Sequence, residues 1–300
     1  METQAAIMWE PGGKWSVETI TLDPPKAGEV LVEMVASGMC HSDDHARTGD
    51  LPAVTPLIGG HEGAGIVMEV GDGVTKFKVG DRVLGTTGNN GGMAEKVVLN
   101  AATTYELPAE RSFAEGAALI LTYGTSIHAL LDRGHIKEGD TLLVLGAAGG
   151  VGLAAIELGV AFGARVVAAV SSEEKAKVAL EAGASDVVIY GRAPFDKEQS
   201  KALADAFKKA VGPNGADVIY DAVGGDYADP AIRCMAWEGR YLVVGFPAGI
   251  PKLPLNLTLL KSCDVCGVFW VPSQCAIRTR TATISPASSA CGRMARSARA

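Results

Sequence analysis

An alternation of short apolar strand-like segments with helical segments runs from residue 141 to about residue 269, and it constrains the fold more than any other feature of the chain. Strands that alternate with helices of about 10–15 residues are typical of βαβ units, which build a parallel sheet. The expected strands are 141–145, 165–170, 186–190, 216–221, 240–244 and 264–269, and the expected helices are 150–162, 173–182, 197–211 and 226–235. We therefore predict an α/β fold with a doubly wound parallel sheet here.

The first third of the chain has a different pattern. Short apolar stretches separated by Gly, Pro and Asp predict a small β-barrel or sandwich. Further on, Ser112 predicts a helix start, because Glu115 can complete a capping box three residues later. The expected strands are 5–9, 30–36, 65–70, 82–84 and 94–98, the loops are 24–25 and 88–92, and the helices run through 117–121 and near 126–133. The predicted domains are 1–115 and 116–270.

The strand at 141–145 leads directly into a glycine-rich turn that opens a helix. A dinucleotide needs this arrangement, because backbone N–H groups and a helix N-terminus then face its pyrophosphate, and side chains would block the approach. A purely structural glycine turn is the alternative, but the strand before it, the helix after it and the further βα units favour a dinucleotide site. The residues expected at the cofactor are Gly146, Ala148, Gly149, Gly150, Val151 and Gly152.

The end of the second strand of this region indicates which dinucleotide is bound. An acidic residue there would bind the ribose 2′-hydroxyl of NAD. The chain instead has Ser171 and Ser172, with Lys175 one turn later, which suit a 2′-phosphate. Glu173 and Glu174 argue against this, although both are also typical of the first turn of a helix. The sequence favours NADPH and leaves NADH open.

A second cluster of chemically active residues lies near the N-terminus. Cys40-His41-Ser42-Asp43-Asp44-His45 lies in a predicted loop and is followed, 21 positions after Cys40, by His61-Glu62. Thiolate, imidazole and carboxylate bind zinc, and a catalytic zinc takes three protein ligands and leaves one position open. The candidate metal ligands are Cys40, His61 and Glu62, with Asp43 nearby as a further oxygen. Unconnected surface groups are the alternative.

These segments resemble the medium-chain dehydrogenase/reductase superfamily over about residues 1–270. Gly60-His61-Glu62-Gly63-Ala64-Gly65, with Gly71 and Val74, resembles the zinc-containing alcohol dehydrogenases, as does the segment 40–45. The part from Gly139 onward resembles the quinone oxidoreductases, on Gly139-Asp140, Leu143 and the segments 119–125, 147–152 and 267–270, although Glu157 and Val160 depart from that pattern. The resemblance implies a chaperonin-like barrel followed by a Rossmann domain, with the active site in the cleft between them.

The resemblance also implies roles for single residues. Ser42 and His45 resemble the proton relay of alcohol dehydrogenases, so Cys40, Ser42, His45 and His61 are the candidate catalytic residues. Tyr190 matches a position near the 2′-phosphate, with packing as the alternative, and Gly245-Phe246 is expected against the nicotinamide ribose. Alcohol dehydrogenases supply a third zinc ligand, a Cys, where this chain has Thr122, and a short glycine loop at 85–92 replaces their four-cysteine lobe. Zinc binding is therefore left open.

Charge and composition exclude other classes of protein. The 27 basic and 34 acidic residues give a net charge of −7, and a nucleic-acid binder would need a basic stripe. No apolar run approaches the roughly 20 residues that span a bilayer, and the N-terminus lacks the pattern of a secretory signal. Six cysteines in 300 residues do not form a disulfide framework, so a reducing cytoplasm is the expected location.

The predicted function is an NAD(P)H-dependent oxidoreductase that transfers hydride to a quinone or an α,β-unsaturated carbonyl without zinc. One alternative is a zinc-dependent alcohol dehydrogenase, in which Cys40, His61 and Glu62 hold the metal. A second alternative is a nucleotide-binding relative that is catalytically impaired. The expected partners are a small-molecule substrate and a second copy of the chain, and Phe269-Trp270 would either pair sheets between subunits or wall the substrate pocket.

The last 30 residues differ from the rest. The segment 271–300 contains five Arg, no Asp and no Glu, and it shows no helical or strand period. We interpret it as an atypical tail, disordered and foreign to the fold, with a natural basic tail as the alternative. An out-of-frame reading of GC-rich coding sequence produces such a composition. Because the resemblance implies a longer chain, we expect a truncated or frameshifted C-terminus.

Overall fold

The structure is a computed structural model that describes residues 1–87 and 91–270. The described residues form two compact units, Met1–Leu121 and Thr122–Trp270, and each unit is treated by itself. The tail at 271–300 and part of the loop predicted at 88–92 lie outside the described residues.

The first unit contains two antiparallel sheets. An isolated bridge between Ala5 and Ala94 joins them, and the apolar faces of both sheets contribute to one core around Val32, Val67 and Leu99. The three-stranded sheet has the order β2-β1-β4, and the five-stranded sheet has the order β7-β3-β5-β6-β8. Their strands are β1 (Glu2–Met8), β2 (Ser16–Thr21), β3 (Glu29–Ser37), β4 (Leu57–Ile58), β5 (Glu62–Val70), β6 (Arg82–Thr86), β7 (Lys96–Asn100) and β8 (Thr104–Glu106), with the short helix η1 (Ala101–Thr103) before β8.

The first α-helix of the chain was not predicted, and the second begins as predicted but extends further. Helix α1 (His41–Thr48) stands where a loop is predicted: the carboxylate of Asp43 accepts the backbone N–H of Cys40, and Gly49 ends the helix in the left-handed region at φ 87°. Helix α2 (Phe113–Ile127) confirms the capping box, since Ser112 and Glu115 exchange hydrogen bonds. It passes directly into η2 (His128–Arg133), so the second helix predicted near 126–133 is a continuation.

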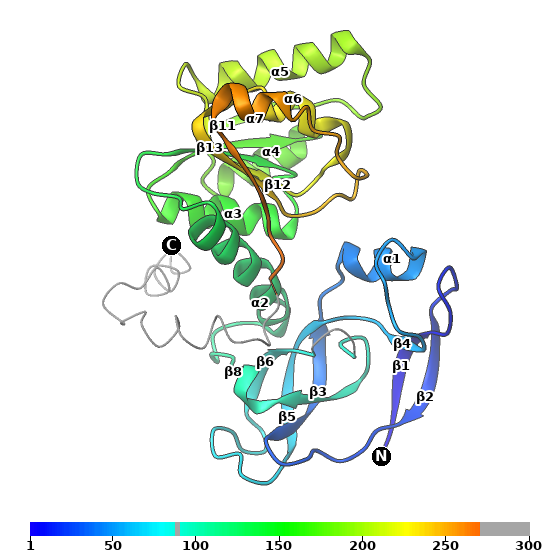
Figure 1. The fold of residues 1–300 in the computed structure, drawn as a ribbon. Coiled ribbons are helices and arrows are strands. Elements are labelled where there is room, and N and C mark those ends of the chain that lie inside the picture. The colour runs from blue at the N-terminus through cyan, green and yellow to red at the C-terminus, as the bar shows by residue number, and fades with distance from the viewer. Residues whose placement is uncertain (88–90, 271–300) are drawn as a thin grey trace. The chain divides into compact units, whose positions relative to one another are not determined.

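The second unit contains a six-stranded, entirely parallel sheet in the order β11-β10-β9-β12-β13-β14, which confirms the predicted α/β class (Figure 1). Its strands are β9 (Thr141–Leu145), β10 (Arg165–Val170), β11 (Asp186–Ile189), β12 (Ala216–Asp221), β13 (Met235–Val243) and β14 (Asp264–Gly267). Its helices are α3 (Gly150–Ala161), α4 (Glu173–Glu181), α5 (Lys197–Val211), η3 (Gly225–Tyr227), α6 (Ala228–Ile232) and α7 (Asn256–Lys261).

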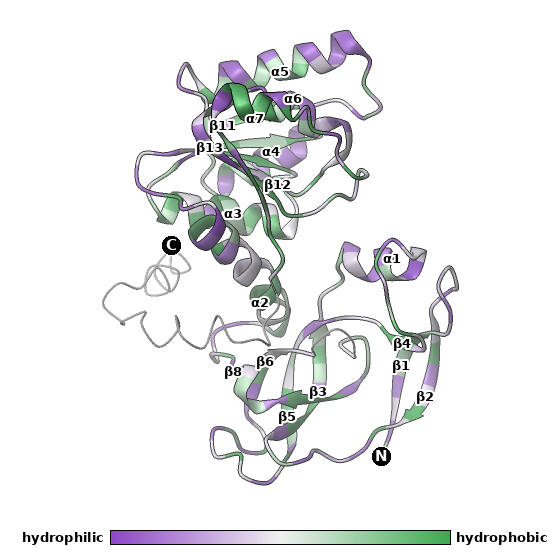
Figure 2. Cartoon of the chain, in the orientation of Figure 1, coloured by the Kyte–Doolittle hydropathy of each residue, from purple (hydrophilic) through white to green (hydrophobic). Residues whose placement is uncertain are grey.

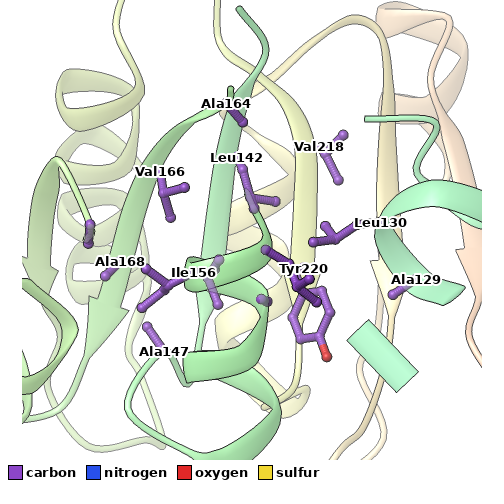
Figure 3. Close-up of a cluster of buried hydrophobic side chains, with 14 of the residues drawn as sticks. Ala129, Leu130, Leu142, Ala147, Ile156, Ala164, Val166, Ala168, Val218 and Tyr220 are labelled. Carbon is purple, nitrogen blue, oxygen red and sulfur yellow. The ribbon is translucent and has the colours of Figure 1, made fainter. Parts of the chain in front are cut away.

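Helices cover both faces of this sheet. On one face, Ile156 of α3 packs with Leu142, Val166 and Tyr220, all fully buried (Figure 3). On the other face, Phe207 of α5 and residues of α6 pack on the alternate side chains of the same strands. Figure 2 shows green along much of this sheet, as expected for strands buried on both sides. Each fully buried Leu, Ile or Phe contributes roughly 1.5–3 kcal/mol to the free energy of unfolding.

The helix predicted at 226–235 and the strand predicted at 240–244 are wrong in their boundaries. The structure has only η3 and the five-residue α6 there, and β13 begins at Met235. The strand pairing shifts register between Ala216 and Val218, and Glu238 adopts φ 58°. A local irregularity of this kind hides the start of the strand from an apolar-run criterion. In the described residues no helix is long and apolar enough to cross a membrane.

Candidate active site: a dinucleotide turn and a thiol–imidazole–carboxylate cluster

The glycine-rich turn of the second unit has the geometry that a pyrophosphate requires. Strand β9 ends at Leu145, Gly146 turns the chain at φ 69°, and α3 begins after its N-cap residue Gly149. In the described part of the chain, no side chain caps this N-terminus. The first backbone N–H groups of α3 are therefore available to an anion, and the helix dipole favours one there.

Steric constraints explain the other glycines of the turn. A Cβ on Gly152 would overlap the Gly146 carbonyl and lie 2.8 Å from Cα of Ala147, so only glycine allows the helix to pack against the turn. A Cβ on Gly149 would lie 3.3 Å from the same carbonyl oxygen, which is tight but tolerable. Gly149 is thus not required by packing alone, and the open space above it fits a bound pyrophosphate.

The loop after β12 supports the turn from the side, and the sequence analysis missed the residue that holds it. Asp221 is fully buried. Its Oδ1 accepts the backbone N–H groups of Val223 and Gly224 at 2.9 and 2.8 Å, and its Oδ2 accepts the hydroxyl of Tyr241 at 2.6 Å. Val223 in turn lies against the turn, because a Cβ on Gly146 would be 2.8 Å from its Cγ2.

Burial raises the pKa of Asp221, while these three donors act to lower it. A carboxylate at the end of a strand, directly before Ala-Val-Gly-Gly, was the available sequence signal. Asp221 is a positioning residue of the turn.

Gly245 and Phe246 follow β13 at the same, carboxyl-terminal edge of the sheet as the glycine turn. The backbone N–H of Gly245 donates to the Asp221 carbonyl at 3.2 Å, and Phe246 packs closely on Gly224. Parallel strands place such loops around the ligand crevice. The expected contact with nicotinamide ribose stays a prediction.

The residues predicted at the 2′-phosphate lie together at the end of β10. Ser172 is the N-cap of α4 and accepts the backbone N–H of Lys175, whose Nζ donates to Oγ of Ser171 at 3.1 Å. An ammonium and a hydroxyl are thus presented at one point, with Glu173 and Glu174 in the first turn of the helix.

Tyr190 has a different surrounding from these polar groups. It is buried, its ring lies 4.8 Å from that of Tyr227, and its hydroxyl accepts the backbone N–H of Gly146. Burial is the main cause that raises its pKa to about 12. Tyr190 supports the glycine turn from beneath.

In the first unit, the structure brings Cys40, Asp43 and His61 together. Asp43 Oδ1 lies 3.5 Å from His61 Nδ1 and accepts the backbone N–H of Gly60 at 2.9 Å, while Oδ2 accepts that of Cys40. Helix α1 and the segment before β5 are thereby tied by one carboxylate. The ring of His61 also interacts with the Cys40 thiol, which Ser42 hydrogen-bonds.

The pKa values in this cluster are shifted by its own members. Burial acts to lower the pKa of His61, but the hydrogen bonds and charges of Asp43 and Cys40 outweigh it and raise the pKa to about 10. Burial acts to raise the pKa of Cys40, but His61 and Ser42 lower it below its usual range. These shifts favour a protonated His61 beside the carboxylate of Asp43, and they make the Cys40 thiol easier to ionise than an ordinary cysteine.

The carboxylate of Glu62 lies beside Gly38. It is buried, its pKa is raised by burial, and Leu121 donates a backbone N–H to it. A Cβ on Gly38 would overlap its Oε1 and lie 2.6 Å from its Cδ. Oε2 has no hydrogen-bond partner within residues 1–87 and 91–270.

The placement of Glu62 decides the fit of the predicted zinc ligands. Among the described residues, no group of three His, Cys, Asp or Glu side chains is placed to hold a metal ion. Of the three predicted zinc ligands, Cys40 and His61 interact with each other, whereas the carboxylate of Glu62 lies beside Gly38. Two ligands together and a third apart do not fit a catalytic zinc, which needs three protein ligands around one ion. Zinc binding stays a prediction from the sequence.

Gly38→Ala tests the position of Glu62. We expect the free energy of unfolding to fall by about 1–3 kcal/mol, because the added methyl overlaps a buried carboxylate. Urea denaturation measures it. When Gly38→Ala is introduced into a Glu62→Ala variant, most of this cost should disappear. When it is introduced into a Glu62→Gln variant, which keeps the size of the side chain, the cost should remain. Equal costs of Gly38→Ala in all three backgrounds would contradict this placement.

Ser42 and His45, the predicted proton relay, have different partners in the structure. Ser42 hydrogen-bonds the Cys40 thiol, and His45 Nδ1 lies 3.4 Å from Asp50 Oδ2. Both residues lie on α1. Their relay role stays a prediction.

Comparison with known proteins decides the family. The model of the alcohol dehydrogenase GroES-like domain matches residues 26–109, and that of the zinc-binding dehydrogenases matches residues 150–282. The quinone oxidoreductase-like protein 2 of Rattus norvegicus is 36% identical over 271 residues, which cover 89% of this chain and 75% of that protein. This chain belongs to the medium-chain dehydrogenase/reductase superfamily. It is a member with quinone oxidoreductase character, and the superfamily consists of NAD(P)-dependent oxidoreductases.

Other relatives agree with this placement of the chain among medium-chain dehydrogenases/reductases. The quinone oxidoreductase-like protein 2 homologue of Nematostella vectensis is 41% identical over 217 residues. The match covers 72% of this chain and 57% of that protein. The crystal structure of the Escherichia coli quinone oxidoreductase complexed with NADPH superposes with a TM-score of 0.77 at 29% identity, covering 90% of this chain and 81% of that one. The predicted superfamily and two-domain α/β fold are therefore confirmed.

Proposed function

We propose that this protein transfers hydride from NADPH to a quinone or an α,β-unsaturated carbonyl. The observation that carries the proposal is the glycine turn after β9, where the uncapped N-terminus of α3 and the space above Gly149 suit a pyrophosphate. The relatives named quinone oxidoreductases, one of them complexed with NADPH, support the same reaction.

When bound, NADPH would supply the hydride from its nicotinamide ring. The protein's own residues supply binding and orientation. The N–H groups at the start of α3 would hold the pyrophosphate, and Lys175 with Ser171 would bind the 2′-phosphate. Asp221 and Tyr190 would hold the turn in the shape that keeps its carbonyl and N–H groups fixed.

Turnover of NADPH and of NADH with a quinone, an enone and an aldehyde tests the proposal. We expect NADPH to be oxidised by the quinone or the enone. Turnover confined to the aldehyde and dependent on zinc would instead support the alcohol dehydrogenase alternative. Binding of NADPH without turnover of any acceptor would support the catalytically impaired relative.

The Lys175→Ala variant tests the coenzyme preference. Removing one charge-assisted hydrogen bond to the 2′-phosphate should raise KM for NADPH roughly tenfold and change KM for NADH less than about twofold. Lys177→Ala, which removes an exposed lysine from the same helix, is the matched control. Equal changes for both coenzymes would show that Lys175 does not read the 2′-phosphate.

We further propose that two copies of the chain associate along β14. We also propose that the enzyme is cytoplasmic and does not bind nucleic acid. In the described residues β14 is one of the two edge strands of the sheet and pairs only with β13. Apolar side chains in the segments just before and after it are exposed: Leu259 of α7 is 80% and Phe269 is 82% accessible. The mass of the protein in solution tests this, and a monomer would contradict it.

A further inference from the structure

The second unit contains a basic pocket that the dinucleotide site does not use. The pocket has a volume of about 510 Å³, within the usual range of roughly 300–1,000 Å³ for small-ligand sites. Four cationic side chains line it, and its lining contains no Asp or Glu: the cations are Lys208, Lys209, Arg233 and Lys261. In a chain with a net charge of −7, such a concentration of positive charge needs a reason.

The four cations come from three separate parts of the fold. Lys208 and Lys209 lie in the last turn of α5, where lysines also complement the helix dipole. Lys261 likewise lies in the last turn of α7, and Arg233 is the C-cap residue of α6, so all four cations lie at helix C-termini. A helix dipole does not by itself explain why three separate helix ends bring their cations to one pocket. Lys208 and Lys261 both act electrostatically on the buried thiol of Cys234, whose pKa burial raises to about 12. Both lysines line the same pocket, and Lys208 is oriented by Asp205, whose Oδ1 lies 3.4 Å from its Nζ.

Two of the cations are held in position with donors left over. The Nζ of Lys261 donates to the Met235 carbonyl at 2.8 Å, which leaves two of its three protons for a ligand. Arg233 is oriented by Asp229, which accepts from its Nε and Nη2, both at 3.0 Å. The second amino group of this guanidinium remains available as a donor. Asn214 adds a neutral amide to the lining.

The pocket lies at the amino-terminal ends of the parallel strands, whereas the coenzyme loops lie at their carboxyl-terminal ends. It is lined by the residues just before β12 and at the start of β13, whereas the coenzyme turn and Asp221 lie where parallel strands end. Because β12 has six residues, the two ends are roughly 20 Å apart. A ligand here would occupy a site separate from the coenzyme.

We propose that this pocket binds a small anion that carries phosphate groups, such as a diphosphate. Multiple ammonium groups and a guanidinium are the donors that bind phosphate oxygens, and charge-assisted hydrogen bonds of this kind are the strong ones. The site does not depend on the reaction proposed above.

Isothermal titration of the full chain with inorganic pyrophosphate, in the presence of saturating NADPH, tests the proposal. We expect one binding site, and we expect Lys209→Glu to weaken it at least tenfold. Lys201→Glu, which changes the same charge on an exposed part of α5 outside the pocket, should leave binding within about twofold. Inorganic phosphate should bind more weakly than pyrophosphate.

Lys261→Gln provides a second variant, which removes the charge, shortens the side chain by one atom and should also weaken binding at least tenfold. Circular dichroism verifies that each variant is folded. The absence of pyrophosphate binding, or binding that is unaltered in both pocket variants, would overturn the proposal. Because pyrophosphate bound at the glycine turn would be insensitive to Lys209, the two sites are distinguished.

Discussion

Gly149→Val is expected to weaken NADPH binding by about 100-fold or more while the protein stays folded. The backbone of Gly149 has φ −80° and ψ 165°, which any residue adopts, and a Cβ there meets only the Gly146 carbonyl at 3.3 Å. The branched side chain would instead occupy the space in front of the α3 N-terminus. A loss of that size corresponds to about 2.7 kcal/mol of binding free energy. Titration of NADPH fluorescence measures it.

Two further variants, one at Gly149 and one at Gly152, serve as controls for this result. Gly149→Ala should give an intermediate loss, because its methyl group reaches less far into the phosphate position. Gly152→Val should fail to fold, because its Cβ meets backbone atoms of Gly146 and Ala147. Unchanged NADPH affinity in folded Gly149→Val would show that the pyrophosphate does not lie at this turn.

Asp221→Ala should lower the free energy of unfolding by about 3–5 kcal/mol, among the largest effects of any single substitution here. The side chain is fully buried, and its removal leaves the N–H groups of Val223 and Gly224 and the hydroxyl of Tyr241 without their acceptor. Urea denaturation of the free protein measures the change. A cost below about 1 kcal/mol would contradict the role of Asp221 as the anchor of this loop.

Asp221→Asn is the matched variant. The amide oxygen can still accept both backbone N–H groups, and its NH₂ group can donate to the hydroxyl of Tyr241. We therefore expect a smaller cost, of about 1–2 kcal/mol. If the loop positions the glycine turn, the Asn variant should also keep most of the NADPH affinity, whereas the Ala variant should lose affinity even where it is folded.

Much of the second unit could be predicted from the sequence, because its signals are local. The strand before the turn, the glycines of the turn and the helix after it are consecutive, and 141–145 matches β9 to the residue. The start of β13 could not be predicted in this way, because an irregular pairing places it at Met235. Helix α1 was also not predicted, because the carboxylate of Asp43 stabilises a helix in a segment predicted as a loop.

The candidate site of the first unit shows a different limit. The residue types around Cys40 and His61 are correct for a metal site, and the spacing resembles that of zinc enzymes. The spacing does not reveal that Asp43 bridges His61 and α1, or that Glu62 turns toward Gly38. These contacts join residues 17 to 24 positions apart, and the absence of a side chain at Gly38 determines where the carboxylate can lie.

The sequence by itself determined the class of fold, the position of the dinucleotide turn and the superfamily, because strand–helix periodicity and glycine placement are properties of consecutive residues. Only the tertiary structure decided which side chains act together: Asp221 with Tyr241, Cys40 with His61, and four cations in one pocket. The physical reason is that such groups meet through the pairing of strands and the packing of helices, which burial of the whole core selects and no local pattern encodes.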